Sequence, residues 1–141
     1  TLSLRNTFES KGFSYAFMAD KTIPEIQIDR YAVSDAFINL IDNAIKYSAD
    51  KKDIVIRTGK NQKHVFVEVE DHGIGISTHN QRFIFDKFFR VTEKDLANKV
   101  KGSGLGLSIV KHIMDAHKGE IKVTSNPGEG SVFRLLFPVN N

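Results

Sequence analysis

Residues 53–71 read DIVIRTGKNQKHVFVEVED, and this stretch decides the fold class. Apolar and polar residues alternate with period two over 53–60 and again over 63–71, which is the pattern of strands with one buried face. The polar segment GKNQ, residues 59–62, separates the two runs. The stretch therefore predicts an antiparallel β-hairpin.

Further elements are predicted on both sides of this hairpin. Strand patterns occur at four other places: residues 13–19, the end of 23–29, 120–126 and 131–138. Helical periodicity occurs at three: residues 30–48, 78–89 and 105–117, the last ended by Gly119 as a C-cap glycine. Helices that alternate with antiparallel strands predict an α+β two-layer sandwich, in which about three helices cover one face of a mixed, mostly antiparallel sheet of about five strands.

Composition excludes several classes of function. The 141 residues suit one domain, and 40% of them are hydrophobic, enough for one sizeable core. A net charge of +3, spread along the chain, does not predict a nucleic-acid partner. The absence of cysteine excludes disulfides, thiol catalysis and thiolate metal sites. No apolar run approaches the length of a membrane span, and Thr1 in place of Met predicts a piece of a longer chain.

The helix predicted at 30–48 has two distinct sides. An apolar stripe faces the core: Val33, Phe37, Leu40, Ile41, Ala44 and Ile45. A polar set lies elsewhere: Asn39, Asn43, Lys46 and Tyr47. The polar set has two interpretations, a solvated face or a site in which an asparagine oxygen ligates Mg²⁺, lysine meets a phosphate and tyrosine stacks on a base.

Three glycines precede the last predicted helix, in the segment GSGLGLSIV at 102–110. Their G-x-G-x-G spacing matches neither the dinucleotide fingerprint nor the P-loop. Glycines allow a backbone to approach a ligand closely, and a helix N-terminus offers free N–H groups to an anion. The segment is therefore either a phosphate cradle or a flexible loop.

Asp71 ends the second strand of the hairpin, and Gly73 and Gly75 follow it. One interpretation is a strand-terminating turn, because Asp and Gly are ordinary turn residues. The other is a carboxylate that reads a base. A carboxylate only accepts hydrogen bonds, so it suits the exocyclic amine of adenine and rejects the carbonyl of guanine.

Taken together, these segments resemble the motifs of bacterial sensor histidine kinases. INLIDNAIKYS (38–48) resembles their N box, and DHGIGI (71–76) resembles their first glycine box. FDKFFR (85–90) resembles their F box, and GSGLGLSIV (102–110) resembles their second glycine box. GEGSVFRLLFP (128–138) resembles their closing strand, and all occur in the family's order, within residues 25–138. The resemblance implies the Bergerat ATP-binding fold, shared with gyrase, mismatch-repair ATPases and a heat-shock chaperone. KYS after the N box, together with the F box, favours the kinases within that superfamily.

The resemblance implies ATP and Mg²⁺ as cofactors and assigns residues to them. Asn43 would ligate Mg²⁺, Asn39 would face the phosphates or the metal's water shell, and Lys46 and Arg90 would meet phosphates. These four form the predicted catalytic set. The base would be bound by Tyr47, Asp71, Gly73, Gly75, Ile76, Leu105, Leu107 and Ser131. The lid would be formed by Gly102, Gly104 and Gly106 and rooted by Phe85, Phe88 and Phe89, although ordinary core packing also accounts for the aromatic residues.

The resemblance also implies a function and its partners. The domain, residues 1–141, would bind Mg-ATP and donate the γ-phosphoryl group to a histidine on a separate helical dimerisation domain, with a response regulator downstream. None of the five histidines has the family's acceptor setting, so the acceptor is expected outside this chain. The parent would be a membrane-bound sensor with this domain in the cytoplasm, without membrane insertion or nucleic-acid binding by the domain. Alternatives are a Bergerat-fold ATPase, an anti-sigma-type serine kinase, which would carry an acid at position 39, or a nucleotide-binding module without transfer activity.

Overall fold

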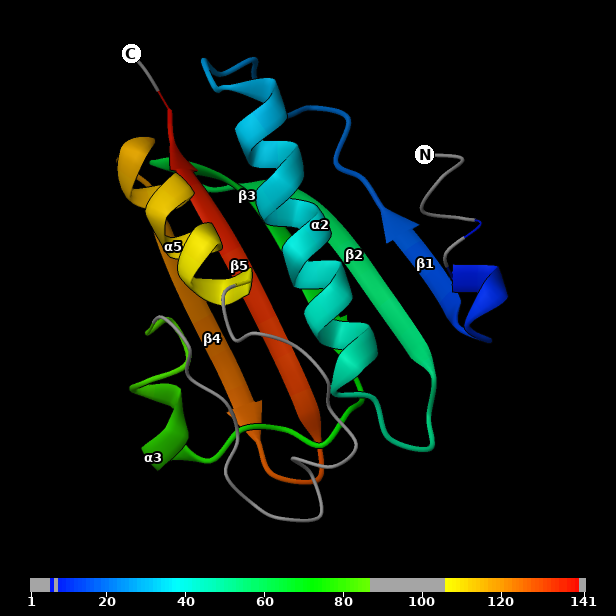
Figure 1. The fold of residues 1–141 in the computed structure, drawn as a ribbon. Coiled ribbons are helices and arrows are strands. Elements are labelled where there is room, and N and C mark those ends of the chain that lie inside the picture. The colour runs from blue at the N-terminus through cyan, green and yellow to red at the C-terminus, as the bar shows by residue number, and fades with distance from the viewer. Residues whose placement is uncertain (1–5, 7, 87–105, 140–141) are drawn as a thin grey trace.

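The computed structural model describes residues 6, 8–86 and 106–139 of the chain. Within them a five-stranded sheet has the order β1-β2-β3-β5-β4 (Figure 1). The strands span Ser14–Met18 (β1), Asp53–Lys60 (β2), His64–Asp71 (β3), Glu120–Asn126 (β4) and Gly130–Pro138 (β5). β1 pairs with β2 in parallel, and the other three pairings are antiparallel. The mixed, mostly antiparallel sheet and the hairpin at 53–71 are therefore confirmed.

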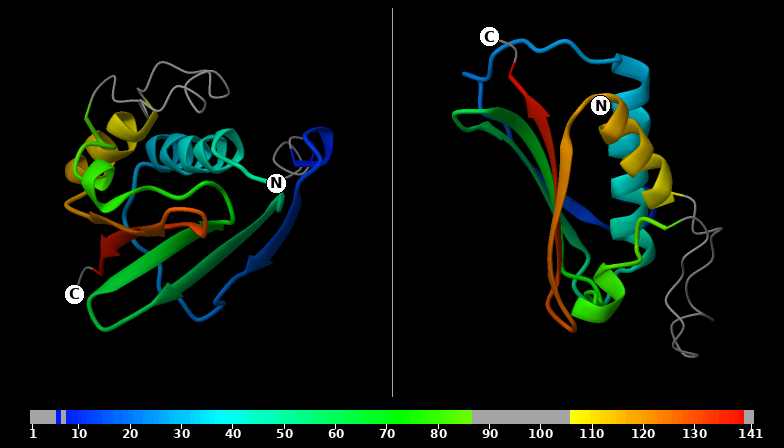
Figure 2. Two further views of the ribbon diagram at one scale, coloured as in Figure 1. Left: turned by 90° about the horizontal axis from the view of Figure 1, so that it is seen from below. Right: turned by 90° about the vertical axis from the view of Figure 1, so that its left-hand side faces the viewer.

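Two long helices cover one face of this sheet. Figure 2 shows α2 (Arg30–Lys46) and α5 (Gly106–Ala116) lying side by side on it. α2 begins at its predicted residue because the Asp29 carboxylate accepts hydrogen bonds from the N–H groups of Tyr31 and Ala32, both at 3.1 Å. The short helix α3 (Thr78–Gln81) lies near the end of β4. The predicted two-layer α+β sandwich is confirmed.

The core fills the space between the helices and the sheet. Leu40 and Ile41 of α2 and Met114 of α5 are almost completely buried, and they pack against Val69 of β3 and Leu135 of β5. Side chains alternate between the faces of a strand, so odd-numbered residues of β3, β4 and β5 point towards the helices. At the end of the sheet near α3, the terminal helix-facing position of each of these three strands is polar rather than apolar. None of the helices in the described ranges is long and apolar enough to cross a membrane.

Three predicted details of the elements are wrong. Residues 23–29 pair with no strand, because β1 occupies the place beside β2; Ile26 packs against the core from an irregular segment. The helix predicted at 78–89 ends at Gln81 and continues as turns to residue 86. At the end of α5, Lys118 rather than Gly119 takes the left-handed conformation, with φ of 57°. Position 119 excludes a side chain for another reason: a Cβ there would lie 2.4 Å from the carbonyl oxygen of Leu136.

Candidate functional site

A row of polar side chains crosses the sheet where the apolar rows end. Asp71 of β3 is paired with Ser131 of β5, which is paired with Ser125 of β4. All three residues occupy helix-facing positions, one step beyond the core row of Val69, Phe133 and Val123. Asp71 and Ser131 are only 7% and 6% exposed. The fold thus holds a carboxylate and two hydroxyls, from three strands, at the edge of the core.

The Asp71 carboxylate is held by backbone donors. Its Oδ1 accepts a hydrogen bond from the N–H of Gly73 at 2.9 Å. Burial raises the pKa of the Asp71 carboxyl, and hydrogen bonds from the backbones of Gly73 and Ser131 offset part of that rise. The result is a fixed, poorly solvated hydrogen-bond acceptor.

The loop after β3 is tied to the end of α2. The N–H of Ile74 donates to the carbonyl oxygen of Tyr47, the C-cap of α2, at 3.0 Å. Gly73 lies so close to the same carbonyl that a Cβ there would be 2.1 Å from its oxygen. Only glycine fits at position 73 without a shift of the backbone. The end of the predicted N box and the first glycine box are therefore in direct contact.

The other side of the same loop is tied to the β4–β5 turn. Gly75 has a φ of 74°, and a Cβ there would lie 2.0 Å from the carbonyl oxygen of Asn126. The N–H of Gly128 donates to the carbonyl oxygen of Ile74 at 2.7 Å, and the N–H of Ile76 donates to Ser125 Oγ at 2.8 Å. The loop is thus fixed between α2 and the turn.

The N-terminus of α5 approaches the polar side of α2. A Cβ at Gly106 would lie 3.2 Å from Asn39 Oδ1. The side-chain N–H of Asn39 donates to the carbonyl oxygen of Asp35 at 2.9 Å, so Asn39 Oδ1 points away from Asp35. Asn39, Asn43 and Tyr47 are half-buried, and Lys46 is exposed on the last turn. The polar side of α2 is therefore a boundary with α5 rather than a fully solvated face.

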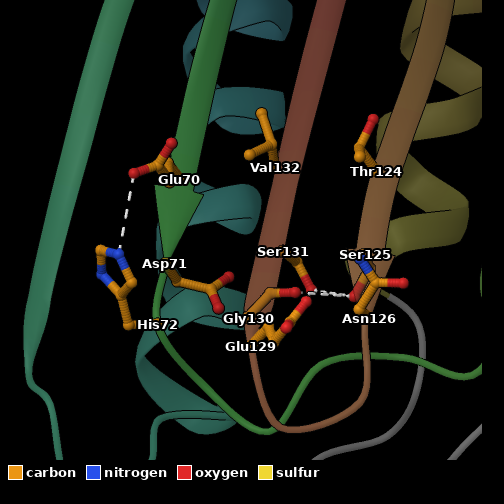
Figure 3. Close-up of a pocket in the computed structure, with 10 residues that line it drawn as sticks. All are labelled: Glu70, Asp71, His72, Thr124, Ser125, Asn126, Glu129, Gly130, Ser131 and Val132. Carbon is orange, nitrogen blue, oxygen red and sulfur yellow. Dashed lines mark hydrogen bonds and ion pairs between the residues drawn. The ribbon is translucent and has the colours of Figure 1, made fainter.

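A hollow of about 290 Å³ opens at the same end of the sheet. Figure 3 shows Glu70, Val132 and Thr124 along it, and alternation along the strands places these side chains on the face away from the helices. His72 lies at its edge, with Nδ1 2.9 Å from Asp53 Oδ1 and Nε2 3.8 Å from Glu70 Oε2. The hollow adjoins the polar row through the backbone, but it opens on the opposite side from the asparagines of α2.

The comparisons with known proteins agree with this geometry. Residues 28–141 match the family model of histidine kinase-, DNA gyrase B- and HSP90-like ATPases. The chain belongs to this ATPase family. Members of such a family differ in what they do with a nucleotide, so the relatives that are similar over most of the chain narrow the assignment.

Several relatives of this ATPase-family domain are histidine kinases. The signal transduction histidine-protein kinase ArlS of Staphylococcus aureus is 39% identical over 125 residues, which are 87% of this chain. The chain spans 28% of the length of ArlS. The solved catalytic domain of histidine kinase ThkA has a TM-score of 0.80 at 28% identity and covers 97% of this chain and 87% of that one. Full-length ShkA in complex with AMPPNP has a TM-score of 0.80 at 25% identity and covers 96% of this chain and 27% of that one. The predicted resemblance to sensor histidine kinases is confirmed.

The structure brings together predicted site residues from four motifs. They are linked by the contacts above: Asn39 with Gly106, Tyr47 with Gly73, Asp71 with Ser131, and Ile76 with the β4–β5 region. Leu107 and Phe85 are partly buried against the core, so ordinary core packing accounts for Phe85. Ile84, which the sequence did not single out, is 5% exposed and more deeply buried than Phe85. Other predicted residues lie outside the described ranges: Phe88, Phe89, Arg90, Gly102, Gly104 and Leu105.

Sequence reasoning missed two residues that hold the site together. Ser125 Oγ bonds to three other residues of the loop and of β5. The side-chain N–H₂ of Gln81 donates to the carbonyl oxygens of Ile76 at 2.9 Å and Ser125 at 3.1 Å. No local pattern marks either residue, because their partners depend on the register of β4 against β5.

Proposed function

We propose that this domain binds Mg-ATP and donates the γ-phosphoryl group of ATP to a histidine on a separate helical domain of the same kinase. The single observation that best supports the proposal is the convergence of four sequence motifs. The end of α2 contacts the loop after β3, the end of β3 pairs with the start of β5, and the N-terminus of α5 approaches the middle of α2 at Asn39. The names of the relatives favour phosphotransfer over other uses of ATP.

The base would be read at the sheet side of the site. Asp71 is a fixed acceptor, so it pairs with the 6-amino group of adenine and leaves no donor for a 6-carbonyl. A buried acceptor that loses its partner costs about 1–3 kcal/mol, which is enough to prefer ATP over GTP. Gly73, Gly75 and Ile76 belong to the loop beside this carboxylate. The backbone of Tyr47 is hydrogen-bonded to the same loop.

The phosphates would lie along the polar side of α2 towards α5. Asn39 Oδ1 is directed towards the start of α5, where free N–H groups favour an anion. Lys46 is exposed and free to extend to a phosphate as a point charge. Gly102 and Gly104 keep their predicted contribution to the lid, Leu105 its predicted contact with the base, and Arg90 its predicted contribution to charge neutralisation.

The donor set of α2 fits a magnesium ion that is bound mainly through the nucleotide. The residues of the described ranges contain no cluster of three acids or histidines that would hold a metal alone. Asn43 is half-buried one turn after Asn39, and an amide oxygen is a hard ligand of the kind Mg²⁺ accepts beside phosphate oxygens and waters. Mg²⁺ would neutralise charge on the triphosphate, while the chain holds the nucleotide in line for attack by the acceptor.

The phosphoacceptor histidine would lie outside this chain. His64 is on β3, His72 is paired with Asp53, and His79 packs edge-on against Phe83. The remaining two are on or after α5, where His112 is exposed and His117 is bonded to Ile113 and Asp29. The partner would be a helical dimerisation domain of the parent kinase, and a response regulator would act downstream. The parent would be a membrane-bound sensor whose catalytic part is cytoplasmic.

Hydrolysis is the alternative use of ATP. Efficient hydrolysis needs a base that activates water. Position 39 carries an amide, which donates and accepts hydrogen bonds but does not take up a proton near neutral pH. Asn39 therefore favours transfer to an external nucleophile over hydrolysis.

A transfer experiment tests the proposal. The chain is mixed with the helical domain of its parent kinase and with ATP labelled on the γ-phosphate. We expect label on the helical domain that is lost in acid, no label on this chain, and no transfer when the acceptor histidine is replaced. Release of labelled inorganic phosphate without transfer would support the ATPase alternative, and absence of ATP binding would reject the nucleotide assignment.

A further inference from the structure

Ser125 lies at the centre of a small hydrogen-bond network behind the proposed base site. Its Oγ accepts a hydrogen bond from the N–H of Ile76 at 2.8 Å. It donates to the carbonyl oxygen of Gly130 at 2.9 Å. It also lies 2.7 Å from Ser131 Oγ. Every one of these distances is within the range of a good hydrogen bond.

Counting protons fixes the direction of the bond between the two serines. A serine hydroxyl has one proton and two acceptor lone pairs. The Gly130 carbonyl can only accept, so the proton of Ser125 is used there. Ile76 occupies one of the lone pairs of Ser125 Oγ. The bond between the serines therefore uses the proton of Ser131, donated to the remaining lone pair of Ser125.

We propose that Ser125 is a positioning residue that makes Ser131 an acceptor, so that the base edge of the site offers acceptors only. This inference rests on the proposed binding of ATP. With its proton committed to Ser125, Ser131 Oγ presents only lone pairs to the site, beside the acceptor Asp71. Two acceptors in one cross-strand row match the two hydrogens of a 6-amino group, whereas a 6-carbonyl in the same place would face two acceptors.

Ser125 is itself held in place from the side of α3. The Gln81 side chain donates to the carbonyl oxygens of Ser125 and Ile76, which joins the two residues through their backbones as well as through Oγ. With its backbone held in this way, the Ser125 side chain can turn away from Ser131 only by breaking its Oγ bonds to Ile76 and Gly130. Gln81 supports the arrangement, whereas Ser125 determines the direction of the proton.

Binding of ATP and of ITP tests this inference, because ITP has a carbonyl in place of the 6-amino group and carries a proton on N1, where adenine has an acceptor. The dissociation constants are measured for the wild type and for Ser125→Ala, with thermal unfolding to confirm that each variant is folded. In Ser125→Ala the Ser131 proton is free to rotate towards the base and donate to a carbonyl. We expect the preference for ATP over ITP to fall about three- to tenfold, which corresponds to one hydrogen bond.

Ser77→Ala is the matched control. Ser77 lies in the same loop, and its hydroxyl accepts from the N–H of Asn80 at 3.1 Å at the start of α3. Its loss removes a helix cap without touching the polar row, so the preference between ATP and ITP should not change. If Ser125→Ala weakens ATP and ITP by the same factor, Ser125 has only a structural effect and the inference is wrong.

A second variant keeps the inference testable if Ser125→Ala does not fold. Ser131→Ala removes the proposed acceptor itself, so it should weaken ATP more than ITP; equal losses would overturn the inference while leaving ATP binding intact. A wild-type domain that binds neither nucleotide would overturn the proposed function together with this inference. The two kinds of failure are therefore distinguishable.

Discussion

The carbonyl oxygen of Tyr47 accepts a hydrogen bond from the N–H of Ile74 at 3.0 Å. Tyr47 caps α2, and Ile74 lies in the loop that follows β3. The bond therefore sets the distance between the asparagines of α2 and the carboxylate of Asp71, which belong to different layers of the domain. The proposed phosphate and base positions are held in one frame by backbone contacts rather than by side chains alone.

Replacing Gly75 by Ala should destabilise the domain more than any ordinary turn substitution. The left-handed backbone costs a residue with a Cβ about 1–2 kcal/mol. The new Cβ would also lie 2.0 Å from the Asn126 carbonyl oxygen, and relieving such a clash costs typically about 1–3 kcal/mol more. Urea unfolding of Gly75→Ala measures the total loss.

Gly128→Ala is the control for the backbone term. Gly128 has a similar φ of 81°, but nothing lies within 4 Å of the position of its Cβ. Gly128→Ala should therefore lose only the stability that the left-handed backbone costs a residue with a Cβ, without the cost of a clash. Equal losses for the two variants would show that the close approach of the loop to the β4–β5 turn does not exist in solution.

The buried Asp71 should make stability depend on pH in a defined direction. Burial raises the pKa of Asp71 above its usual 3.8, so the native state binds a proton more tightly than the unfolded state. Its contribution to stability is therefore fully present below about pH 3.8 and is lost as the pH rises through the higher native pKa.

Comparison with Asp71→Asn isolates this effect from the other carboxylates. The free energy of unfolding is measured for both proteins by urea denaturation between pH 3.5 and pH 7. We expect the wild type to lose stability relative to the variant as the pH rises. A wild type that gains stability relative to Asp71→Asn over this range would mean that hydrogen bonds outweigh burial at this site.

Replacing Asn43 by Ala should reduce the effect of Mg²⁺ on ATP binding. The variant loses the proposed amide ligand but keeps the base contacts, so binding of ATP without metal should change little. The factor by which Mg²⁺ strengthens binding should fall about tenfold. Isothermal titration with and without Mg²⁺ measures both quantities.

Asn61→Ala serves as the matched control for Asn43→Ala. The Asn61 side chain accepts from the N–H groups of Lys63 and His64 in the β2–β3 turn, at the other end of the strands from Asp71. This variant should keep the full magnesium effect. If Asn43→Ala behaves like Asn61→Ala in this titration, the metal has a different ligand.

His117 should stabilise the domain without affecting nucleotide binding. Its Nε2 accepts from the N–H of Asp29 at 3.0 Å, so its Nδ1 carries the proton that is donated to the Ile113 carbonyl at 2.8 Å. The ring thereby links the start of α2 to the end of α5. His117→Ala should lose about 1 kcal/mol of stability or more, whereas the exposed His112→Ala should lose little. A measurable change in ATP affinity for His117→Ala would contradict its purely structural assignment.

The sequence predicted those parts of the fold that depend on local periodicity. The hairpin at 53–71 was predicted from alternation and the start of α2 at Arg30 from helical periodicity, and both are present. The strand at the end of 23–29 was wrong because alternation reports one-sided burial, not a neighbouring strand. The extent of α3 was wrong because burial of Ile84 and Phe85 does not require a continuous helix.

Candidate site residues could be selected from the sequence where a residue type carries its chemistry alone. Asp71 at a strand end and the amides of α2 could be selected from the sequence, and the structure brings their segments together. Ser125 and Gln81 could not be selected, because their importance arises from the register between β4 and β5 and from the path of the loop after β3. Such residues become visible only when the pairing of distant segments is known.

Chemical-shift mapping of backbone amides during titration with Mg-ATP tests the central claim most directly. If one nucleotide occupies the junction of α2, the β3 loop, the start of β5 and α5, the largest changes should fall together on residues 39–47, 71–76, 106–108 and 130–131. The turn at 61–63 should serve as an unaffected reference. Changes confined to the opposite face of the sheet, or no saturable change at all, would contradict the account.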